Sequence, residues 1–569
     1  MKNLEIARIF RDIANILEIK GGNVFRIRAY ERAAQNIESL SQDIEDFVKE
    51  ERLLEISGIG RDLSERIREF IKTGKIKIYE DLKSSIPAGL LDLLNIPSVG
   101  PKTAKLLYEK LKIKSVSDLE KAILKDKLKG IFGIKEKTIE NISKGIEILK
   151  RGRERMNLAE AALVAQDFLA PLKKLPQVKK ISLAGSLRRQ KETVRDVDIL
   201  VASDNPKKIV DTFVSLPIVK DILAQGPTKA SVRTKNDVQV DCRVVKEKSF
   251  GAALVYFTGS KNFNIKLRRI AIKKGLKVNE YGIFKGLKVV SGSSEEEIFK
   301  ALKMRYIPAE LREDTGEIEL AQKNQLPHLV ELKDIKGDLH THSLWSDGRD
   351  SIPEMAEAAK SLDYEYIAVT DHSQSLKVAN GLSITDLKNK KREIEQVNKK
   401  MQGLRVLFGT EVDIDSQGKI DYKDEILKQF DIVVAAIHTG FKQSRQQLTR
   451  RVVRACQNKY VHIIAHPTAR LWGVREPFDI DLEEIFKVAC DTNTALEINA
   501  FPNRLDLNDS NCRRAKEKGV RLAIGTDSHS KEQLESMKLG ISVARRGWLS
   551  RQDVINTLPL KQLLKTIKK

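Results

Sequence analysis

The stretch DLHTHSLWSDG, from Asp338 to Gly348, decides the fold of the C-terminal part of this 569-residue chain. It is a short apolar run that ends in histidines and a carboxylate. Six more runs of this kind follow, each preceded by a polar, helix-like stretch: YIAVTDH (Tyr366–His372), RVLFGTEV (Arg405–Val412), DIVVAAIH (Asp431–His438), HIIAHP (His462–Pro467), ALEINA (Ala495–Ala500) and RLAIGTDSH (Arg521–His529). Strand followed by helix, seven times over, predicts a distorted (βα)7 barrel whose strand ends converge on one mouth.

Histidines and carboxylates stand at the ends of these runs and are the candidate metal ligands. His340 and His342, two residues apart on a strand, share one face, as do Asp527 and His529. Imidazole and carboxylate ligands without thiolates favour Mn²⁺, Zn²⁺ or Fe²⁺ in a catalytic site. The full set is His340, His342, Asp347, His372, Glu411, His438, His466, Asp527 and His529. The two remaining histidines, His328 and His462, do not close a strand, so we expect structural roles for them.

The order of these motifs resembles that of the PHP (polymerase and histidinol phosphatase) family over residues 333–569. The resemblance implies up to three ions, Mn²⁺ or Zn²⁺, that together hydrolyse a phosphoester. It implies that Glu411 bridges two of the ions. The implied sets are His340, His342, Glu411 and Asp527 for the first ion, Glu411, His438 and His466 for the second, and Asp347, His372 and His529 for the third.

The charge of the chain indicates a polyanionic partner, with nucleic acid as the leading candidate. Lys and Arg number 102 against 79 Asp and Glu, which gives a net charge of +23. Residues 151–320 hold 33 basic and 21 acidic side chains, a net +12 and about half of the excess. The four cysteines lack CxxC spacing, and no N-terminal stretch has the length and apolarity of a signal peptide or a membrane span. We therefore expect a cytoplasmic, nucleoid-associated protein, and we expect a monomer.

The first 150 residues are helical in pattern and contain two glycine turns, LLEISGIGRDLSERI (Leu53–Ile67) and LLNIPSVGPKTAKLL (Leu93–Leu107). Both predict helix-hairpin-helix turns, with a looser third at LKGIFGIKEKTI (Leu128–Ile139). In such a turn glycine lets the backbone approach a phosphate, and the N–H groups that open the next helix bind it without reading sequence. The predicted DNA contacts are Gly58 and Gly60 in the first turn and Gly100 and Lys102 in the second.

The middle of the chain contains LAGSLRRQKETVRDVDILV (Leu183–Val201), a Gly-Ser turn followed by Asp-x-Asp on an apolar strand. This is typical of a nucleotidyltransferase. Asp196 and Asp198 project from one strand face and are suited to share two Mg²⁺ ions. A third carboxylate, Asp241 in VQVDCRVV (Val238–Val245), lies on another strand-like run. These three are the predicted catalytic residues and Mg²⁺ ligands of an α/β palm.

The string YFTGSKNFNIKLRR, from Tyr256 to Arg269, resembles the thumb of family X DNA polymerases, and the resemblance extends over essentially the whole chain. It implies a helical 8-kDa-like domain over residues 1–80, in which Arg26, Arg28 and Tyr30 of FRIRAYERAA form the pocket for a gap 5′-phosphate. It implies nucleotide contacts from Gly185, Ser186, Arg189, Tyr256, Phe257, Gly259 and Asn264, and a template contact from Arg268.

One feature departs from the family pattern. Eukaryotic relatives place lysines of 5′-deoxyribose-phosphate lyase chemistry on the first glycine turn, and the aligned residues here are Asp62 and Arg66. Neither is an effective amine nucleophile. We therefore expect little lyase activity at this site unless another amine such as Lys72 substitutes.

The resemblance thus implies a multidomain repair polymerase of the bacterial or archaeal two-enzyme type. The predicted domains are the 8-kDa-like region (1–80), fingers (81–150), palm (151–250), thumb (251–315), a linker (316–332) and the PHP barrel (333–569). The palm would fill short gaps with deoxynucleoside triphosphates on gapped or nicked DNA. The barrel would act as a 3′–5′ exonuclease, with abasic-site endonuclease or 3′-phosphatase activity as further options. The alternatives are a barrel that is structural or clears pyrophosphate, and a small-molecule phosphoesterase of the histidinol-phosphatase kind.

Overall fold

The computed structural model describes residues 2–39, 44–56, 58–87, 89–96, 99–129, 131, 134, 136, 138–140, 142–143, 146, 155–472, 475 and 477–567. The third predicted glycine turn contains Gly130, Phe132, Gly133, Lys135 and Lys137, which lie outside these residues. The chain divides into two units. One comprises residues 1–155, 261–278 and 284–287, and the other comprises residues 156–260, 279–283 and 288–569. Helix α13 (Lys261–Lys273) groups with the N-terminal residues, so the division passes through the predicted thumb.

The N-terminal unit is helical, as the sequence predicts. Its helices are α1 (Lys2–Ile19), α2 (Val24–Ser39), α3 (Ile44–Lys49), α4 (Arg61–Thr73), α5 (Lys77–Ser84), α6 (Pro101–Leu111) and α7 (Val116–Leu124). Two apolar clusters hold them together. Phe10, Tyr30 and Ile67 belong to the first, and Leu93 and Leu107 belong to the second. Each glycine turn therefore sits on a packed core of its own.

The palm is a five-stranded sheet in the order β2-β4-β7-β6-β5. Its strands are β2 (Lys180–Leu183), β4 (Asp196–Ala202), β5 (Val219–Gln225), β6 (Lys229–Thr234) and β7 (Gln239–Val245), and its helices are α9 (Leu158–Lys173), α10 (Gly185–Arg188), α11 (Pro206–Val214) and α12 (Phe250–Thr258). β4 and β7 run parallel and place Asp198 opposite Asp241. A separate short pair joins β1 (Met156–Asn157) to β3 (Thr193–Val194).

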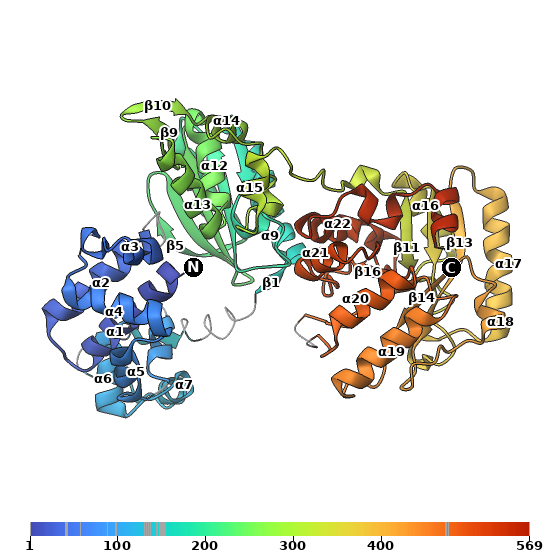
Figure 1. Ribbon diagram of the computed structural model, residues 1–569, viewed down its shortest axis with the longest axis horizontal. Helices are drawn as coiled ribbons and strands as arrows, with labels where there is room; N and C mark the ends of the chain where they lie inside the picture. Colours follow the sequence, from blue (N-terminus) through green and yellow to red (C-terminus); the bar gives the residue numbers. More distant parts are fainter. Residues whose placement is uncertain are drawn as a thin grey trace. The chain divides into compact units, whose positions relative to one another are not determined.

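The C-terminal barrel has seven parallel strands in sequence order. They are β11 (Gly337–Thr341), β12 (Tyr366–Val369), β13 (Arg405–Asp413), β14 (Ile432–Ala436), β15 (Ile463–Ile464), β16 (Ala495–Asn499) and β17 (Leu522–Gly525). Around them lie α16 (Ile352–Ser361), α17 (Ile384–Lys400), α18 (Asp424–Leu427), α19 (Arg445–Gln457), α20 (Leu482–Asp491), α21 (Asp509–Glu517), α22 (Met537–Arg546) and α23 (Leu560–Thr566) (Figure 1). The chain after β17 returns to β11, since Asp527 N–H donates to the His340 carbonyl at 2.9 Å. The predicted seven-unit barrel is confirmed.

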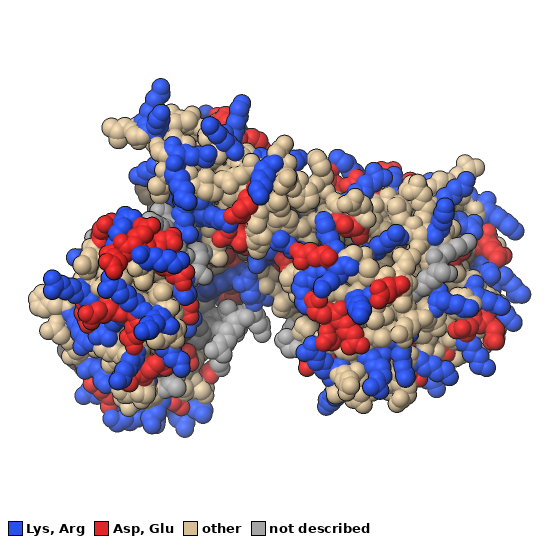
Figure 2. Space-filling model, viewed as in Figure 1, with Lys and Arg blue, Asp and Glu red and all other residues tan. Residues whose placement is uncertain are grey.

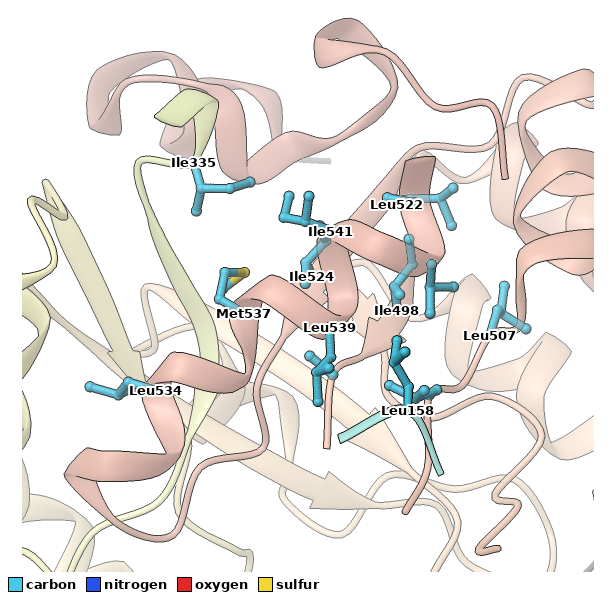
Figure 3. Packing of buried hydrophobic residues seen from close by; sticks show 14 of the residues in the cluster. Leu158, Ile335, Ile498, Leu507, Leu522, Ile524, Leu534, Met537, Leu539 and Ile541 are labelled. Carbon is cyan, nitrogen blue, oxygen red and sulfur yellow. The ribbon is translucent and has the colours of Figure 1, made fainter. Parts of the chain in front are cut away.

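The palm and the barrel share one apolar core. Figure 3 places Leu158, the first residue of α9, among Ile498, Leu507 and Leu539 of the barrel. Leu158 is 1 % exposed. Burial of this kind stabilises association because apolar surface leaves water. The two domains are therefore parts of one folded body.

The segment between thumb and barrel differs from the predicted linker over residues 316–332. It contains helix α15 (Glu317–Gln322), which buries Ile318 and Ala321. The Glu317 carboxylate accepts the Asp314 and Thr315 backbone N–H groups, which fixes the entry to this helix. Before it come β8 (Lys277–Asn279), β9 (Gly282–Lys285), β10 (Lys288–Ser291) and α14 (Glu295–Ala301). Two apolar residues on one helical turn are too few for sequence periodicity to detect.

Charged side chains are spread over much of the visible face of the protein. Figure 2 shows Lys and Arg interspersed with acidic groups and with broad uncharged areas. Among the described residues, no helix combines the length and apolarity needed to cross a bilayer.

Candidate functional sites

Three carboxylates meet at the end of two neighbouring palm strands. Asp196 and Asp198 lie on β4, and Asp241 lies directly across from Asp198 on β7. Burial, followed by the charges of Asp196 and Asp241, raises the pKa of Asp198 to about 7. Like charges held this close need a counter-charge, and oxygen-only ligands suit hard divalent cations such as Mg²⁺. The structure thus brings together the three predicted carboxylates, Asp196, Asp198 and Asp241.

Gly185 makes this arrangement sterically feasible. It adopts a φ of +60°, and a Cβ there would lie 2.0 Å from Asp198 Oδ2. Only glycine satisfies both conditions. Ser186 follows it on α10, and the Ala184 N–H donates to the Asp198 carbonyl at 2.8 Å, which ties the Gly-Ser turn to the acidic strand.

A cavity of about 330 Å³ opens beside these carboxylates. Asp198, Asp241, Arg243 and Phe257 are among its lining residues. The Arg243 guanidinium lies 4.9 Å from the centre of the Phe257 ring, and Tyr256 packs against the same ring edge-on at 5.1 Å. Tyr256 is 38 % exposed, so it is not simply a core aromatic. A cation stacked on an aromatic ring beside paired carboxylates suits a nucleotide with its counter-ions.

The two arginines of the Gly-Ser motif are not a solvated pair. Arg188 donates to both oxygens of Glu295, at 2.8 and 2.5 Å, and Arg312 reaches the same carboxylate at 2.7 Å. Arg189, predicted to bind a triphosphate, pairs with Glu313 at 3.0 Å and donates to the Thr258 carbonyl. Arg188 therefore joins palm to thumb. Arg189 holds a carboxylate in the place where an anionic ligand was expected.

The other predicted nucleotide and template residues lie on or next to α13. Gly259 precedes that helix with a φ of +72°. Asn264 and Arg268 are half-buried on it, and Arg268 Nε donates to the Asn264 carbonyl at 3.4 Å.

The helices that follow the first two glycine turns begin in the same way. Gly60 and Gly100 precede α4 and α6 in extended conformation, and neither helix has a side-chain cap. A Cβ on either glycine would meet nothing within 4 Å, whereas Gly58 needs its φ of +81°. The first N–H groups of each helix are therefore accessible to an external anion, which the helix dipole favours. Lys102 lies in the first turn of α6.

The residues of the predicted 5′-phosphate pocket differ in their exposure. Arg26 and Arg28 are exposed on α2, and Phe25 is 81 % exposed. Tyr30 is 1 % exposed and packs edge-on against Phe10, with ring centres 5.3 Å apart. The prediction that Tyr30 contacts DNA is therefore wrong. Tyr30 lies three residues after the buried Ile27, on the buried face of α2, whereas Arg28 lies on the exposed face.

The two residues at the lyase positions bind each other. Arg66 Nη2 lies 2.8 Å from Asp62 Oδ1, one helical turn away on α4, and Lys72 is exposed on the same helix. A paired, protonated guanidinium is not a nucleophile. The expectation of little lyase activity at these two positions stays a prediction.

All nine predicted metal ligands converge at the C-terminal mouth of the barrel. Three groups have ligand atoms within 4.8 Å of one another: His342, Asp347, His372 and His529; His340, His342 and Asp527; and His372, Glu411 and His438. This partition differs from the one implied by resemblance. His342 and His372 each occur in two groups, Glu411 occurs in one, and His466 occurs in none, although His466 Nε2 lies 3.1 Å from Glu411 Oε1. His462 accepts the Val433 N–H at 2.9 Å, which is the structural role expected for it.

Glu411 stands at the centre of the cluster. Its two oxygens lie within 3.6 Å of His340, His342, His372, His438 and His466. Burial acts to raise the pKa of this carboxyl, but the charges of His372 and His438 outweigh burial and hold the pKa well below its usual range. Glu411 is 1 % exposed. An ionised, buried carboxylate facing five imidazoles is placed to bridge cations.

The residues present fit divalent metal ions. Nδ1 of His342 is buried, lies 3.8 Å from Asp347 Oδ1 and lacks a hydrogen-bond partner within the described part of the chain. The Nε2 atoms of His340 and His342 face each other at 3.2 Å. Buried imidazole lone pairs without donors are costly unless a cation accepts them. Burial and then the charge of Arg504 lower the pKa of His466 to about 4. Its imidazole is therefore neutral at neutral pH, which is the form that binds a metal ion.

Two carboxylates that the sequence reasoning missed orient the ligating histidines. His340 Nδ1 lies 2.6 Å from Glu497 on β16, and His438 Nδ1 lies 2.7 Å from Asp413 on β13. Such contacts fix the tautomer and the ring orientation of a metal ligand. Glu497 is a charged residue inside the apolar run ALEINA, and this exception to the pattern could have indicated a functional residue.

A buried ion pair supports the loop that carries His342 and Asp347. The Asp371 carboxylate accepts the Ser343 N–H at 2.8 Å and the Ser346 hydroxyl at 2.7 Å. Lys390 on α17 lies 2.8 Å from the same carboxylate, and both side chains are fully buried. Asp371 is the middle residue of TDH, so its role is to hold the ligand loop in place.

Arg504 is a further residue at this mouth that no motif indicated. Its Nε lies 3.3 Å from Asp527 Oδ2, and its Nη1 is buried without a hydrogen-bond partner in the described residues. A guanidinium with spare donors beside a metal cluster suits an anionic oxygen of a phosphoester.

Comparison with protein families matches four parts of the chain. A helix-hairpin-helix domain matches residues 1–76, and a SAM-like helix-hairpin-helix tandem matches residues 90–147. The DNA polymerase beta thumb matches residues 253–313, and the PHP domain matches residues 338–500.

Individual relatives agree with this division. The chain is 39 % identical to the DNA polymerase/3′-5′ exonuclease PolX of Bacillus subtilis, over 99 % of both chains. It is 24 % identical to DNA polymerase lambda of Rattus norvegicus, over 53 % of this chain and 55 % of that protein. It is also 29 % identical to a probable phosphatase of Thermoanaerobacter, over 39 % of this chain and 89 % of that one.

Proposed function

Because this chain belongs to the family X DNA polymerases that carry a C-terminal PHP domain, we propose that its palm carboxylates extend a DNA strand and its barrel cluster shortens one. The chain is a DNA polymerase and a 3′–5′ exonuclease, with DNA and deoxynucleoside triphosphates as substrates. The proposal assigns residues, metals and the form of the DNA to these activities.

In the palm, Asp196, Asp198 and Asp241 hold two Mg²⁺ ions. The ions supply charge neutralisation for the attacking and leaving oxygens of phosphoryl transfer. The observation that carries this assignment is the register that sets Asp198 opposite Asp241, with Gly185 pressed against Asp198. Asp241 would also accept the proton of the 3′-hydroxyl.

The cavity beside these carboxylates receives the nucleotide. Tyr256 and Phe257 would pack against its sugar, Ser186 and Arg189 would hold its triphosphate, and Gly259 would allow close approach. Asn264 and Arg268 would contact the base and the template strand. The triphosphate would replace Glu313 as the partner of Arg189. Comparing insertion of a deoxynucleotide with its ribonucleotide tests the sugar contact, and equal efficiencies would rule it out.

The preferred DNA is a short gap with a 5′-phosphate, so the enzyme would act in DNA repair. It would work as a monomer, in the cytoplasm at the nucleoid. Gly58, Gly60, Gly100 and Lys102 would bind phosphates along the backbone, and Arg26 and Arg28 would bind the 5′-phosphate. The exposed arginines of α2 and the uncapped starts of α4 and α6 support this. Gap filling and binding with and without the 5′-phosphate test it, and indifference to that phosphate would contradict the pocket.

In the barrel, up to three Mn²⁺ or Zn²⁺ ions are held by His340, His342, Asp347, His372, Glu411, His438, His466, Asp527 and His529. When bound, the ions generate hydroxide at neutral pH and stabilise the leaving oxygen. Glu497 and Asp413 keep His340 and His438 in the ligating tautomer, and Arg504 holds the phosphate. The convergence of five imidazoles on Glu411 carries this proposal.

Removal of a 3′-phosphate is a second activity that this barrel supports. The similarity to a probable phosphatase over most of that protein's length favours it. Full-length protein with an intact or a substituted cluster would be given DNA ending in 3′-hydroxyl or 3′-phosphate. If substitution of Glu411 abolishes both 3′–5′ degradation and removal of the 3′-phosphate, both activities belong to the barrel. Unchanged degradation would favour a structural or pyrophosphate-clearing barrel.

A further inference from the structure

The loop Phe501–Asp506, between β16 and α21, carries Arg504 to the metal cluster. Arg504 Nε lies 3.3 Å from Asp527 Oδ2, while Asp527 Oδ1 faces His340 and His342 at 3.7 and 3.3 Å. The arginine thus occupies one carboxylate oxygen and leaves the other for the imidazole side. Asn499 Nδ2 on β16 also donates to Asp527 Oδ2, at 3.1 Å, so the orientation of Asp527 depends on Asn499 and on where this loop holds Arg504.

Arg470 fixes the backbone of that loop. Its Nε donates to the Arg504 carbonyl at 2.7 Å, and its Nη2 donates to the Leu505 carbonyl. Arg470 is only 7 % exposed and lies four residues after His466. A planar guanidinium that binds two successive carbonyls sets both the position and the orientation of the peptide between them.

The remaining edge of Arg470 is held by the palm. Arg470 Nη1 lies 2.9 Å from Glu192 Oε2, in a pair whose side chains are 8 % and 14 % exposed. Glu192 follows the Gly-Ser motif and immediately precedes β3. A buried ion pair is costly to break, because removing one partner leaves the other charge desolvated.

A second palm residue reaches the same loop. Asn157 Nδ2 donates to Asn503 Oδ1 at 2.9 Å. Asn157 is adjacent to Glu192 in space, since Asn157 pairs with Thr193 and the Leu158 N–H donates to the Glu192 carbonyl at 2.9 Å. The short β1–β3 pair therefore contacts the loop directly through Asn157 and indirectly through Arg470.

We propose that Glu192 and Arg470 are positioning residues through which the polymerase palm sets the metal affinity of the exonuclease barrel. The contacts run from Glu192 to Arg470, to the backbone of Arg504, and through the Arg504 side chain to Asp527. This inference rests on the proposed function, which makes Asp527 a metal ligand. The palm thereby completes a site to which it contributes no ligand.

The test uses the full-length chain with Glu192→Gln, which keeps shape and removes charge, and Arg470→Lys, which keeps charge and loses the paired carbonyl contacts. The metal-free proteins are titrated with Mn²⁺, and bound metal is measured directly. We expect half-saturation at roughly tenfold higher Mn²⁺, as for other residues that orient metal ligands. Exonuclease kcat should fall at low Mn²⁺ and recover at saturating Mn²⁺.

Two controls make the outcome unambiguous. Gln190→Ala removes another palm–barrel contact, the one with Ser542 on α22 at 3.0 Å, and should leave Mn²⁺ binding unchanged. Asn503→Ala removes the contact with Asn157 Nδ2 but leaves the Asn157 cap of α9 in place, so it is a milder loosening of the same loop, and it replaces Glu192→Gln if that variant has a lowered unfolding midpoint. Unchanged or tighter Mn²⁺ binding in the Glu192 and Arg470 variants would overturn the inference.

The variant Asp527→Ala distinguishes a wrong positioning role from a wrong ligand assignment. Asp527→Ala should lose both a bound ion and exonuclease activity. If it does, and the Glu192 and Arg470 variants behave as wild type, only the positioning role is wrong. If Asp527→Ala itself keeps its metal count and activity, the ligand assignment is wrong.

Discussion

At the scale of single residues, the two sites depend on carboxylates in opposite surroundings. Asp198 faces other carboxylates, and burial together with those charges raises its pKa to about 7. Glu411 faces imidazoles, which hold its pKa well below the usual range in spite of burial. Both arrangements call for cations, since the palm has excess negative charge and the barrel has unsatisfied imidazole nitrogens. Substitution of either residue should therefore separate the two activities.

We expect Asp198→Ala to lower nucleotide addition by ~10³-fold or more, because the metal pair loses a ligand that stabilises charge in the transition state. Degradation of 3′ ends should be retained, since the barrel shares no ligand with the palm. Primer extension and exonuclease assays on one preparation measure both. Near-normal extension would remove Asp198 from the catalytic residues.

Glu411→Ala should give the reverse pattern. A bridging carboxylate touches more than one ion, so its loss should reduce the number of bound ions by more than one and abolish metal-dependent 3′–5′ degradation. Gap filling through Asp198 should continue. Elemental analysis with activity assays checks this, and His438→Ala, which should cost a single ion, is the matched comparison. A variant with full metal content and activity would contradict the assignment.

At the scale of elements, buried networks fix one helix or loop against the next. Glu295, the first residue of α14, binds Arg188 of α10 and Arg312 beyond α14. Burial alone would raise the pKa of Glu295, but Arg312 and Arg188 lower it to about 2. The glycine turns have a different role, because the first turns of α4 and α6 have no side-chain cap and can bind a ligand instead. One kind of element contributes stability and the other contributes binding.

The Glu295 network should make stability depend on pH. Its folded-state pKa is depressed, so its contribution is fully present above the unfolded-state pKa near 4.5 and is lost as pH falls through about 2. A depression of that size corresponds to about 3 kcal/mol at neutral pH. Glu295→Gln should therefore be less stable than wild type at pH 7, and the difference should shrink between pH 5 and pH 2. Denaturant unfolding at several pH values measures it, and a constant difference would argue against the ion pairs.

Gly60→Val and Gly100→Val should weaken DNA binding without harming the fold, because a Cβ at either site meets nothing within 4 Å. The side chain would instead stand between a phosphate and the helix N–H groups. We expect roughly a tenfold loss of affinity for each, about 1.5 kcal/mol for one charge-assisted hydrogen bond. Binding titrations at several salt concentrations should show an unchanged salt dependence, because neither substitution removes a Lys or Arg. Ser84→Val on α5 is the control, and unchanged affinity in both glycine variants would place DNA elsewhere.

At the scale of the whole molecule, palm and barrel form one folded body. Their apolar residues belong to a single cluster in which Leu158 of the palm meets Leu507 of the barrel (Figure 3). The ion pair Arg470–Glu192 crosses the same boundary, and the ion pair Arg546–Glu313 joins the barrel to the thumb. The N-terminal residues, by contrast, have apolar clusters of their own.

Leu158→Ala should accordingly destabilise both activities together. Truncating a buried leucine leaves a cavity and costs about 2–4 kcal/mol. Polymerase and exonuclease activities should be lost at one lowered temperature in thermal inactivation, because palm and barrel unfold as a unit. Leu163→Ala, at an exposed position of the same helix α9, is the control. Loss of polymerase activity alone would show that the two domains unfold independently.

The sequence by itself determined the features that local rules control. Period-two and strand–helix patterns predicted the barrel and the nine candidate ligands that meet at its mouth, and the Asp-x-Asp spacing predicted that Asp196 and Asp198 share a face. Only the tertiary structure decided what depends on partners far apart in the chain. It buried Tyr30, made α15 part of the body, and brought Glu497 to His340, Lys390 to Asp371, and Glu192 to Arg470. The reason is physical: periodicity records which face of an element is buried, but the identity of a charged group's partner depends on how separate elements pack.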